Sequence, residues 1–243
     1  MLTLLRKELN VFFNSLIGYI VIVIFLIISG FFLWIENGDS NILNANYATL
    51  YPLFVIAPWL FMFLIPALTM RSFSEEYRTG TIELLLTRPL SDFKIILSKY
   101  LAGLILVIIA IIPSLIYYHT IYQLGEPAGN IDFGETLGSY LGLLLLASCY
   151  ISIGIFSSSL TNNQIIAFIT SIFITLVIYM GFDSFADLFY NTGIDYFFKS
   201  ISINEHYLSI ARGVLDTRDL IYFVSLTFIF LFATELKLKS RKW

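Results

Sequence analysis

The chain has 243 residues and is 58% hydrophobic and 13% charged, with a mean hydropathy of +0.84 and a net charge of −3. Soluble domains are about 45–50% apolar and about 25% charged, so this composition excludes an ordinary soluble protein. The apolar residues occur in blocks long enough to cross a bilayer, which takes roughly 20 residues per helix. We therefore predict an integral membrane protein. Its single cysteine, Cys149, excludes an intrachain disulfide and is expected to be a packing residue.

Residues 1–14 place apolar and polar side chains on opposite faces of a helix. The apolar face comprises Leu2, Leu5, Leu9 and Phe12 or Phe13, and the polar face Arg6, Lys7, Asn10 and Asn14. This pattern predicts a helix that lies along the cytoplasmic membrane interface, and the alternative is a merely polar leader. The uncharged run 19–35 ends in bulky side chains where a signal peptide would have its cleavage site, so an uncleaved anchor is expected.

Hydropathy predicts an all-α fold with six transmembrane helices in a single domain that spans residues 1–243. The approximate limits of the spans are 16–35, 51–70, 98–122, 137–159, 164–182 and 217–236. The uncharged block 136–182 is too long for one crossing, and the polar residues 161–164 divide it into two. The last span is short because Asp219 and Glu235 bracket it, so both must reach the headgroups.

The basic residues predict the orientation of the chain. With six spans both termini lie on one side, together with the loop 71–97 and the turn 160–163. That side carries 11 of the 14 Lys and Arg residues, and the first two loops of the other side, 36–50 and 123–136, carry none. The positive-inside rule therefore predicts cytoplasmic termini and a cytoplasmic 71–97 loop.

Prolines and small residues predict how the helices bend and pack. Pro52, Pro58, Pro66 and Pro113 lie in spans two and three, where they predict bends that serve either as gating hinges or as ordinary kinks. Small residues recur four positions apart in spans four and five, at 138 and 142, 148 and 152, and 167 and 171. This spacing predicts close helix packing.

The outer segment 183–216 is long for a free loop and alternates aromatic with acidic residues, as in Phe185, Asp187 and Phe189. Its aromatic content argues against disorder. We expect short helices that dip into the outer leaflet of the membrane.

Several kinds of chemistry are missing from the sequence. No span centre carries an ionisable residue, which argues against proton-coupled or sodium-coupled transport and against a charged channel filter. His119 and His206 fit no metal-ligand spacing and are expected to be interfacial aromatics. There is no nucleophile elbow and no phosphate-binding loop, so we expect a chain that is not an enzyme.

The charged segment 71–97 lies between two long uncharged blocks and carries ordered capping signals. Residues 73–78 predict a short helix, Gly80 a left-handed turn, and Thr81 the start of a second short helix that Pro89 stops. Ser91 and Asp92 are expected to cap the helix into span three. The result would be a helical elbow that a soluble partner can grip, against the alternative of an ordinary solvated loop.

The stretch Glu75-Glu76-x-x-x-Gly80-Thr81-Ile82-Glu83-Leu84-Leu85-Leu86-x-x-Pro89 resembles the signature segment of ABC-2-type transporter permeases. In that family the segment follows span two, as here, and is the coupling helix that docks on a separate ATP-binding subunit. The residues that the resemblance assigns to this contact are Glu75, Glu76, Arg78, Thr79, Gly80, Thr81, Ile82, Glu83 and Leu84. It also implies that this chain holds no cofactor and no metal, because ATP and Mg belong to the partner chain.

Within the family the chain is most similar to the permeases associated with gliding motility. The resemblance implies a bacterial inner-membrane protein that works beside a second permease subunit, identical or paralogous, and for that subgroup beside a further envelope protein; nucleic acid is not an expected partner. The main hypothesis is the permease of an exporter. The alternatives are a membrane scaffold or force transducer that transports nothing, and an intramembrane enzyme, for which the sequence offers no polar groups at depth.

Overall fold

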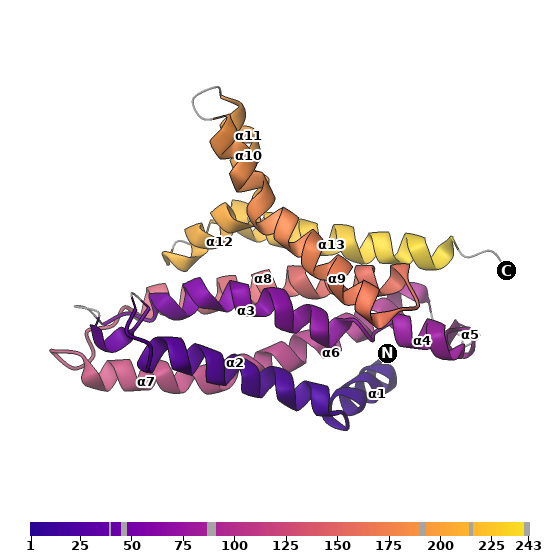
Figure 1. Ribbon diagram of the computed structural model, residues 1–243, viewed down its shortest axis with the longest axis horizontal. Helices are drawn as coiled ribbons and strands as arrows, with labels where there is room; N and C mark the ends of the chain where they lie inside the picture. The colour runs from indigo at the N-terminus through magenta and orange to yellow at the C-terminus, as the bar shows by residue number, and fades with distance from the viewer. Residues whose placement is uncertain (39, 45–47, 87–90, 190–192, 214–215, 241–243) are drawn as a thin grey trace.

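The computed structural model describes residues 1–38, 40–44, 48–86, 91–189, 193–213 and 216–240, and within these ranges the side chains of 84–86 and 194 are not described. All regular elements in the described part are helices (Figure 1). Six helical stretches are long and apolar enough to cross a membrane: Leu16–Trp34, Tyr51–Thr79, Asp92–Leu124, Phe133–Leu160, Gln164–Leu188 and Thr217–Lys239. The predicted all-α membrane fold with six spans is therefore confirmed.

Helix α8 (Phe133–Leu160) forms the centre of the bundle. It packs against α3 (Tyr51–Thr69), α6 (Asp92–Ile111), α9 (Gln164–Leu176), α12 (Ile203–Ala211) and α13 (Thr217–Lys239). Its many Gly and Ser residues are small enough to admit neighbours on several sides, as the sequence pattern predicts. Helix α2 (Leu16–Trp34) lies further out, against α3 and α6.

The glycines of α8 allow close packing of two different neighbours, the outer segment and α3. A Cβ at Gly142 would lie 2.8 Å from the side chain of Ile210, and one at Gly138 would lie 3.3 Å from the backbone of Gly213. These two glycines therefore admit the outer segment, and a third glycine, Gly154, lies against Thr69 of α3.

The prolines act differently in spans two and three. Helix α3 runs through Pro58 and Pro66 without a break. Span three opens at Pro113, where α6 ends at Ile111, a 3₁₀ turn covers Ile112–Ser114 and α7 follows as Leu115–Leu124. Pro113 lacks the backbone donor that an uninterrupted α-helix would use, which explains the local opening.

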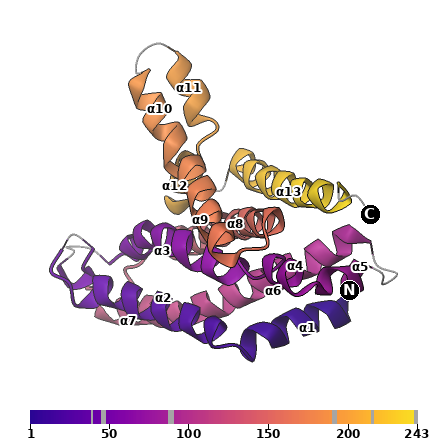
Figure 2. The same cartoon turned by 45° about the vertical axis from the view of Figure 1, so that its right-hand side comes forward.

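One end of the bundle carries the N-terminus, the end of α13 at Lys239 and the segment after span two (Figure 1, Figure 2). The prediction that these parts share one side is confirmed. Helix α1 (Leu2–Phe13) also lies there and buries Leu4 and Glu8 against the bundle, whereas Leu2 is exposed. Its position along the membrane interface stays a prediction. Residues 241–243 lie outside the described part.

The outer segment folds into short helices, as expected. Span five continues through a π-helical turn, Val177–Gly181, into α10 (Phe182–Leu188), and α11 (Ile194–Lys199) and α12 follow. Helices α10 and α11 form a hairpin that extends away from the bundle (Figure 2). The ring of Phe198 stacks on Phe185 and Phe189 within the hairpin, with centroids 5.9 Å apart in both pairs. Insertion of this hairpin into the outer leaflet stays a prediction.

Candidate functional site

The segment after span two forms two short helices that are joined by a turn at Gly80. Helix α4 spans Ser74–Thr79, Gly80 has φ 69° and ψ 4°, and α5 spans Thr81–Leu86. Gly80 adopts the left-handed conformation that an L side chain rarely occupies, which explains a glycine at this position. We call residues 74–86 the elbow. The predicted helix–glycine–helix geometry is confirmed, whereas Pro89, the predicted stop, lies outside the described residues.

The predicted contact residues divide into an exposed edge and a buried side. Arg78, Thr79, Gly80, Thr81 and Glu83 are exposed, and Glu75 is partly exposed and pairs with Arg78 at 3.3 Å. Two further hydrogen bonds rigidify the turn, because the Thr79 hydroxyl donates to the Glu75 carbonyl at 2.8 Å and lies 2.9 Å from the Thr81 hydroxyl.

The other two described members of the predicted set lie on the inner side of the elbow. Ile82 is buried among apolar neighbours, and the Glu76 side chain is only 13% exposed. The side chain of Leu84, the last member, lies outside the described residues. Contact of these residues with a partner stays a prediction, and the structure shows only which of their side chains are exposed.

A serine of span four holds the start of the elbow. The Ser158 hydroxyl accepts the backbone N–H groups of Phe73 at 2.9 Å and Ser74 at 3.1 Å, and it donates to the Met70 carbonyl at 3.1 Å. The Ser74 hydroxyl donates to the same carbonyl. Ser158 is fully buried, so these bonds replace water for backbone groups that would otherwise be unsatisfied at a helix start. Through this side chain the elbow is attached directly to α8.

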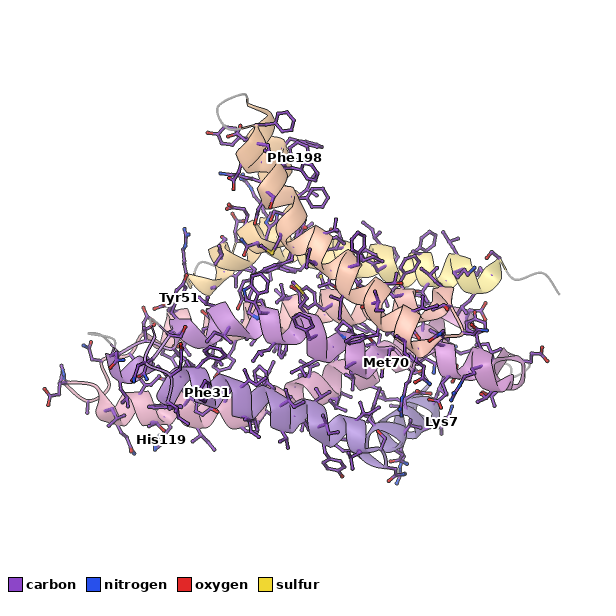
Figure 3. The ribbon with its side chains drawn as sticks, viewed as in Figure 1. Lys7, Phe31, Tyr51, Met70, His119 and Phe198 are labelled. Carbon is purple, nitrogen blue, oxygen red and sulfur yellow. The ribbon has the colours of Figure 1, made fainter. Side chains whose placement is uncertain are left out.

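Buried charges attach the elbow to two more elements. The Lys99 ammonium on α6 lies 2.8 Å from Glu76 of the elbow and 3.4 Å from Glu8 of α1. Lys7 lies 3.4 Å from Glu8 and 3.7 Å from Glu76. We call these four residues the ionic cluster. Figure 3 labels Lys7 and Met70 at this end of the bundle.

The ionic cluster is neutral in sum, and all of its members except the half-exposed Lys7 are strongly desolvated. The side chain of Lys99 is 2% exposed, and its ammonium also lies 5.1 Å from the centre of the Phe73 ring. An isolated ammonium at this depth would be very costly, whereas paired carboxylates and an aromatic face compensate for the lost water. Because each carboxylate belongs to a different element, the cluster fixes α1, α4 and α6 relative to one another.

Sequence reasoning missed Lys99, Glu8 and Ser158. In the sequence Lys99 contributes only a positive charge on the predicted cytoplasmic side, although it lies deeper in the helix of span three than Asp92 and Lys94. Glu8 lies one helical turn after Leu4, and this spacing places both side chains on the same face of the helix. Such signals identify candidates for burial, but the partner of each depends on how distant helices meet.

A hollow of 340 Å³ lies beside the elbow, between α4, the turn from α8 to α9 and the end of α13. Tyr77, Thr161 and Lys237 are among its lining residues. Within the described part of the chain, no three His, Cys, Asp or Glu side chains gather to hold a metal ion. The site is thus built from anchoring contacts on one side and exposed polar groups on the other, which suits the binding of another protein.

The comparisons with known proteins agree with this architecture. A family model described as ABC-2 family transporter protein matches residues 2–234. The chain is also similar to "Uncharacterized protein YhcI" of Bacillus subtilis (strain 168), with 30% identity over 154 residues that cover 56% of this chain. The match spans about half of that relative, 48% of its length. Because the family model covers nearly the whole sequence, the chain belongs to the ABC-2 family of transporter proteins.

Proposed function

We propose that this chain is the transmembrane permease subunit of an ATP-driven exporter and that a separate ATP-binding subunit docks on the elbow. Membership of the ABC-2 family supports the role of a membrane subunit of an ABC transporter. One observation supports the proposed docking surface. The elbow exposes a polar edge, and its inner side is attached to three membrane-crossing helices. A partner bound to this edge would therefore move the membrane helices with it.

The path of the force follows the contacts of the elbow. Residue Glu76 connects it to α6 through Lys99, Ser158 connects it to α8, and the backbone continues directly into α3. Packed elements that move as rigid bodies transmit small displacements over long distances. In this proposal Glu76 and Ile82 position the elbow, and Arg78, Thr79, Thr81 and Glu83 contact the partner.

The hollow beside the elbow extends the proposed docking surface. It joins α4 to the α8–α9 turn and to the end of α13, where Lys237 adds a positive charge. A partner side chain that entered it would contact the end of span four, the turn after it and the end of span six, as well as the elbow. The docking surface would then include several elements at this end of the bundle.

A second permease subunit completes the proposal. Helix α9 exposes Ile165, Ile169 and Phe173, and only 22% of the apolar window of span five is buried within the chain. Lipid or a second subunit can cover such a face, and a pathway between two subunits requires the latter. An identical and a paralogous partner both fit. In this proposal the chain lies in a bacterial inner membrane, and the elbow faces the cytoplasm, as the positive-inside rule predicts.

Co-purification with measured ATPase activity tests the docking proposal. We expect the tagged native chain, extracted in mild detergent, to retain an ATP-hydrolysing subunit. The double variant Arg78→Glu with Glu83→Lys reverses two exposed charges and should remove that activity while the melting temperature of the chain stays unchanged. The control Glu126→Lys reverses an exposed charge at the opposite end and should retain the activity. Full retention in the double variant would refute docking on this edge.

The alternative, a force transducer without a transported substrate, draws support from the α10–α11 hairpin. It extends from the bundle and exposes Leu188, Tyr196 and Phe197, a surface on which an envelope protein can bind. A role in gliding motility rests on sequence resemblance alone. Substrate-stimulated ATPase activity in proteoliposomes would favour the exporter, and strict dependence on an envelope partner would favour the transducer.

A further inference from the structure

A groove of 360 Å³ lies toward the end of the bundle opposite the elbow, where α3 meets the π-helical turn, α10 and α12. Figure 3 labels Tyr51 at this end. The aromatic residues Tyr51, Phe54, Trp59, Tyr179 and Tyr207 form much of its lining. We call this feature the outer groove. It has no contact with the elbow, and nothing in the proposed docking of an ATP-binding subunit uses it.

Carboxylates supply the charge of the outer groove. Asp183 and Asp187 of α10 both line it, and among the described lining residues there is no Lys or Arg to neutralise them. Asp183 accepts one hydrogen bond, from the Asn204 amide to Oδ2 at 2.8 Å. Its Oδ1 is buried and has no hydrogen-bond donor among the described residues. A desolvated carboxylate oxygen without a donor is costly, so the groove favours a cation.

The aromatic rings favour an organic cation. Trp59 and Tyr179 meet edge to face, with centroids 5.8 Å apart and an interplanar angle of 78°. The faces of such rings attract ammonium groups, and Trp is the best of the aromatic side chains for this purpose. Burial raises the pKa of Tyr207 well above its usual range, so this hydroxyl stays a neutral donor to the Phe54 carbonyl at 2.7 Å. Tyr207 therefore adds no negative charge.

The remaining lining residues favour an alkyl chain. Val55 and Met180 line the outer groove and are 40% and 39% exposed, so the groove opens sideways between membrane-crossing helices. An apolar chain that left the groove there would enter the lipid. A bare metal ion would not use these walls, and an anionic amphiphile would meet Asp183 and Asp187.

We propose that the outer groove binds an amphiphile with one ammonium group and one alkyl chain. The ammonium lies beside the carboxylate of Asp183 and the faces of Trp59 and Tyr179, and the chain leaves past Val55 and Met180. Charge complementarity selects the head, and the lateral opening selects the chain.

Quenching of the fluorescence of Trp59 tests this proposal directly. The chain has three tryptophans, so the background Trp34→Phe with Trp243→Phe leaves Trp59 as the only indole. The purified protein in nonionic detergent is titrated with 2-bromoundecyl-trimethylammonium, whose bromine lies next to the ammonium group and quenches an indole on contact. We expect saturable quenching. The bromoalcohol and the bromocarboxylate of the same chain length should require at least about tenfold higher concentrations, because they lack the cation.

Neutralising variants distinguish recognition of the ammonium from simple partitioning into the detergent. Asp183→Asn should raise the half-quenching concentration at least about tenfold, the cost of losing a charge-assisted contact. Asp187→Asn should raise it about threefold, since that side chain is exposed. Glu205→Gln, on an exposed position of α12 outside the lining, is the matched control and should leave quenching unchanged.

Equal quenching by all three probes would overturn the proposal, because only hydrophobic partitioning would then be at work. Unchanged affinity in both aspartate variants would overturn it as well. Because Asp187 is exposed, we expect Asp187→Asn to fold even if Asp183→Asn does not. The melting temperature of each variant checks its folding. None of these measurements requires an ATP-binding subunit, so the result is independent of the docking proposal.

Discussion

Lys99 shows how one residue connects the membrane part of this chain to its soluble surface. Its ammonium lies within 3.4 Å of carboxylates on two other elements, and the side chain is almost fully buried. A buried charge group of this kind contributes little net stability as a whole, yet the loss of one member leaves the others uncompensated. Lys99 is therefore expected to be far more sensitive to substitution than the exposed lysines of the same end.

We expect Lys99→Met to lower the free energy of unfolding by about 3 kcal/mol, because Glu8 and Glu76 lose their buried cation and keep only the half-exposed Lys7. The triple variant Lys99→Met with Glu8→Gln and Glu76→Gln removes all three charges and should be less destabilised than the single variant. Chemical denaturation in detergent measures both. A single variant as stable as the native chain would show that the ionic cluster does not hold the elbow.

Other residues met the sequence expectations more closely. Cys149 is buried and contacts the Phe223 carbonyl at 3.3 Å, as expected for a packing residue. His206 has oxygen partners at both ring nitrogens, Asp219 at 2.6 Å and the Ser200 carbonyl at 3.0 Å. Local chemistry predicted the role of Cys149, but not the pairing of His206 with Asp219, which was expected to reach the headgroups and is buried. The partners of Lys99 were not predictable in this way, since they come from elements 91 and 23 positions away along the chain.

At the scale of elements, the elbow depends on a single left-handed glycine. Gly80 and Gly193 have φ values of 69° and 81°, and in both cases a Cβ would meet nothing within 4 Å. Substitution by alanine therefore strains the backbone without a clash, at a cost of about 1 kcal/mol in either position.

This pair gives a matched test of the elbow. We expect Gly80→Ala and Gly193→Ala to lower the melting temperature by similar amounts, but only Gly80→Ala to reduce the ATPase activity that co-purifies with the chain. The reason is that Gly80 sets the angle between the two helices of the proposed docking surface. Equal retention of ATPase activity in both variants would argue against that role.

Close packing of α3 on α8 depends on Gly154. A Cβ at this position would lie 2.0 Å from the Thr69 hydroxyl and 2.9 Å from its Cβ. We expect Gly154→Ala to destabilise the protein by about 1–3 kcal/mol, the usual cost of overpacking, and Thr69→Ala in addition to restore part of the loss.

Gly181→Ala is the matched control for this prediction, because its Cβ would meet its nearest neighbour at an ordinary 3.5 Å. Melting temperatures of the purified variants make the comparison. If Gly154→Ala were as stable as Gly181→Ala, the helices would not approach each other as closely as the structure has them.

The elements that sequence predicted best are those defined by local signals. Hydropathy predicted six spans, and the corresponding helical stretches extend beyond some of the predicted limits, for example to Thr79 where span two was expected to end at residue 70. Gly80 and Ser91 predicted the ends of the helices around the elbow. The role of Gly138 and Gly142 was predicted only in part: the small spacing indicated close packing, but the neighbour is α12 instead of another span. The spacing of small residues along one helix indicates that another segment packs closely there, but it does not identify that segment.

At the scale of the whole molecule, the two ends of the bundle differ in chemistry. The end with the N-terminus and the end of α13 carries the ionic cluster, the polar edge of the elbow and the hollow beside it. The opposite end carries the outer groove and the aromatic hairpin. This asymmetry is consistent with the two proposals, in which an ATP-binding subunit binds at one end and an amphiphilic molecule binds at the other.

Accessibility of one cysteine tests the central claim, that the elbow faces the cytoplasm and binds an ATP-binding subunit there. In a Cys149→Ser background, Thr79→Cys places a thiol on the exposed edge and Ala128→Cys places one at the opposite end. A membrane-impermeant maleimide should label Ala128→Cys but not Thr79→Cys in intact cells. In inside-out vesicles it should label Thr79→Cys, and co-expression of the ATP-binding subunit should protect that thiol. Labelling of Thr79→Cys from outside intact cells, or no protection by the subunit, would contradict the account.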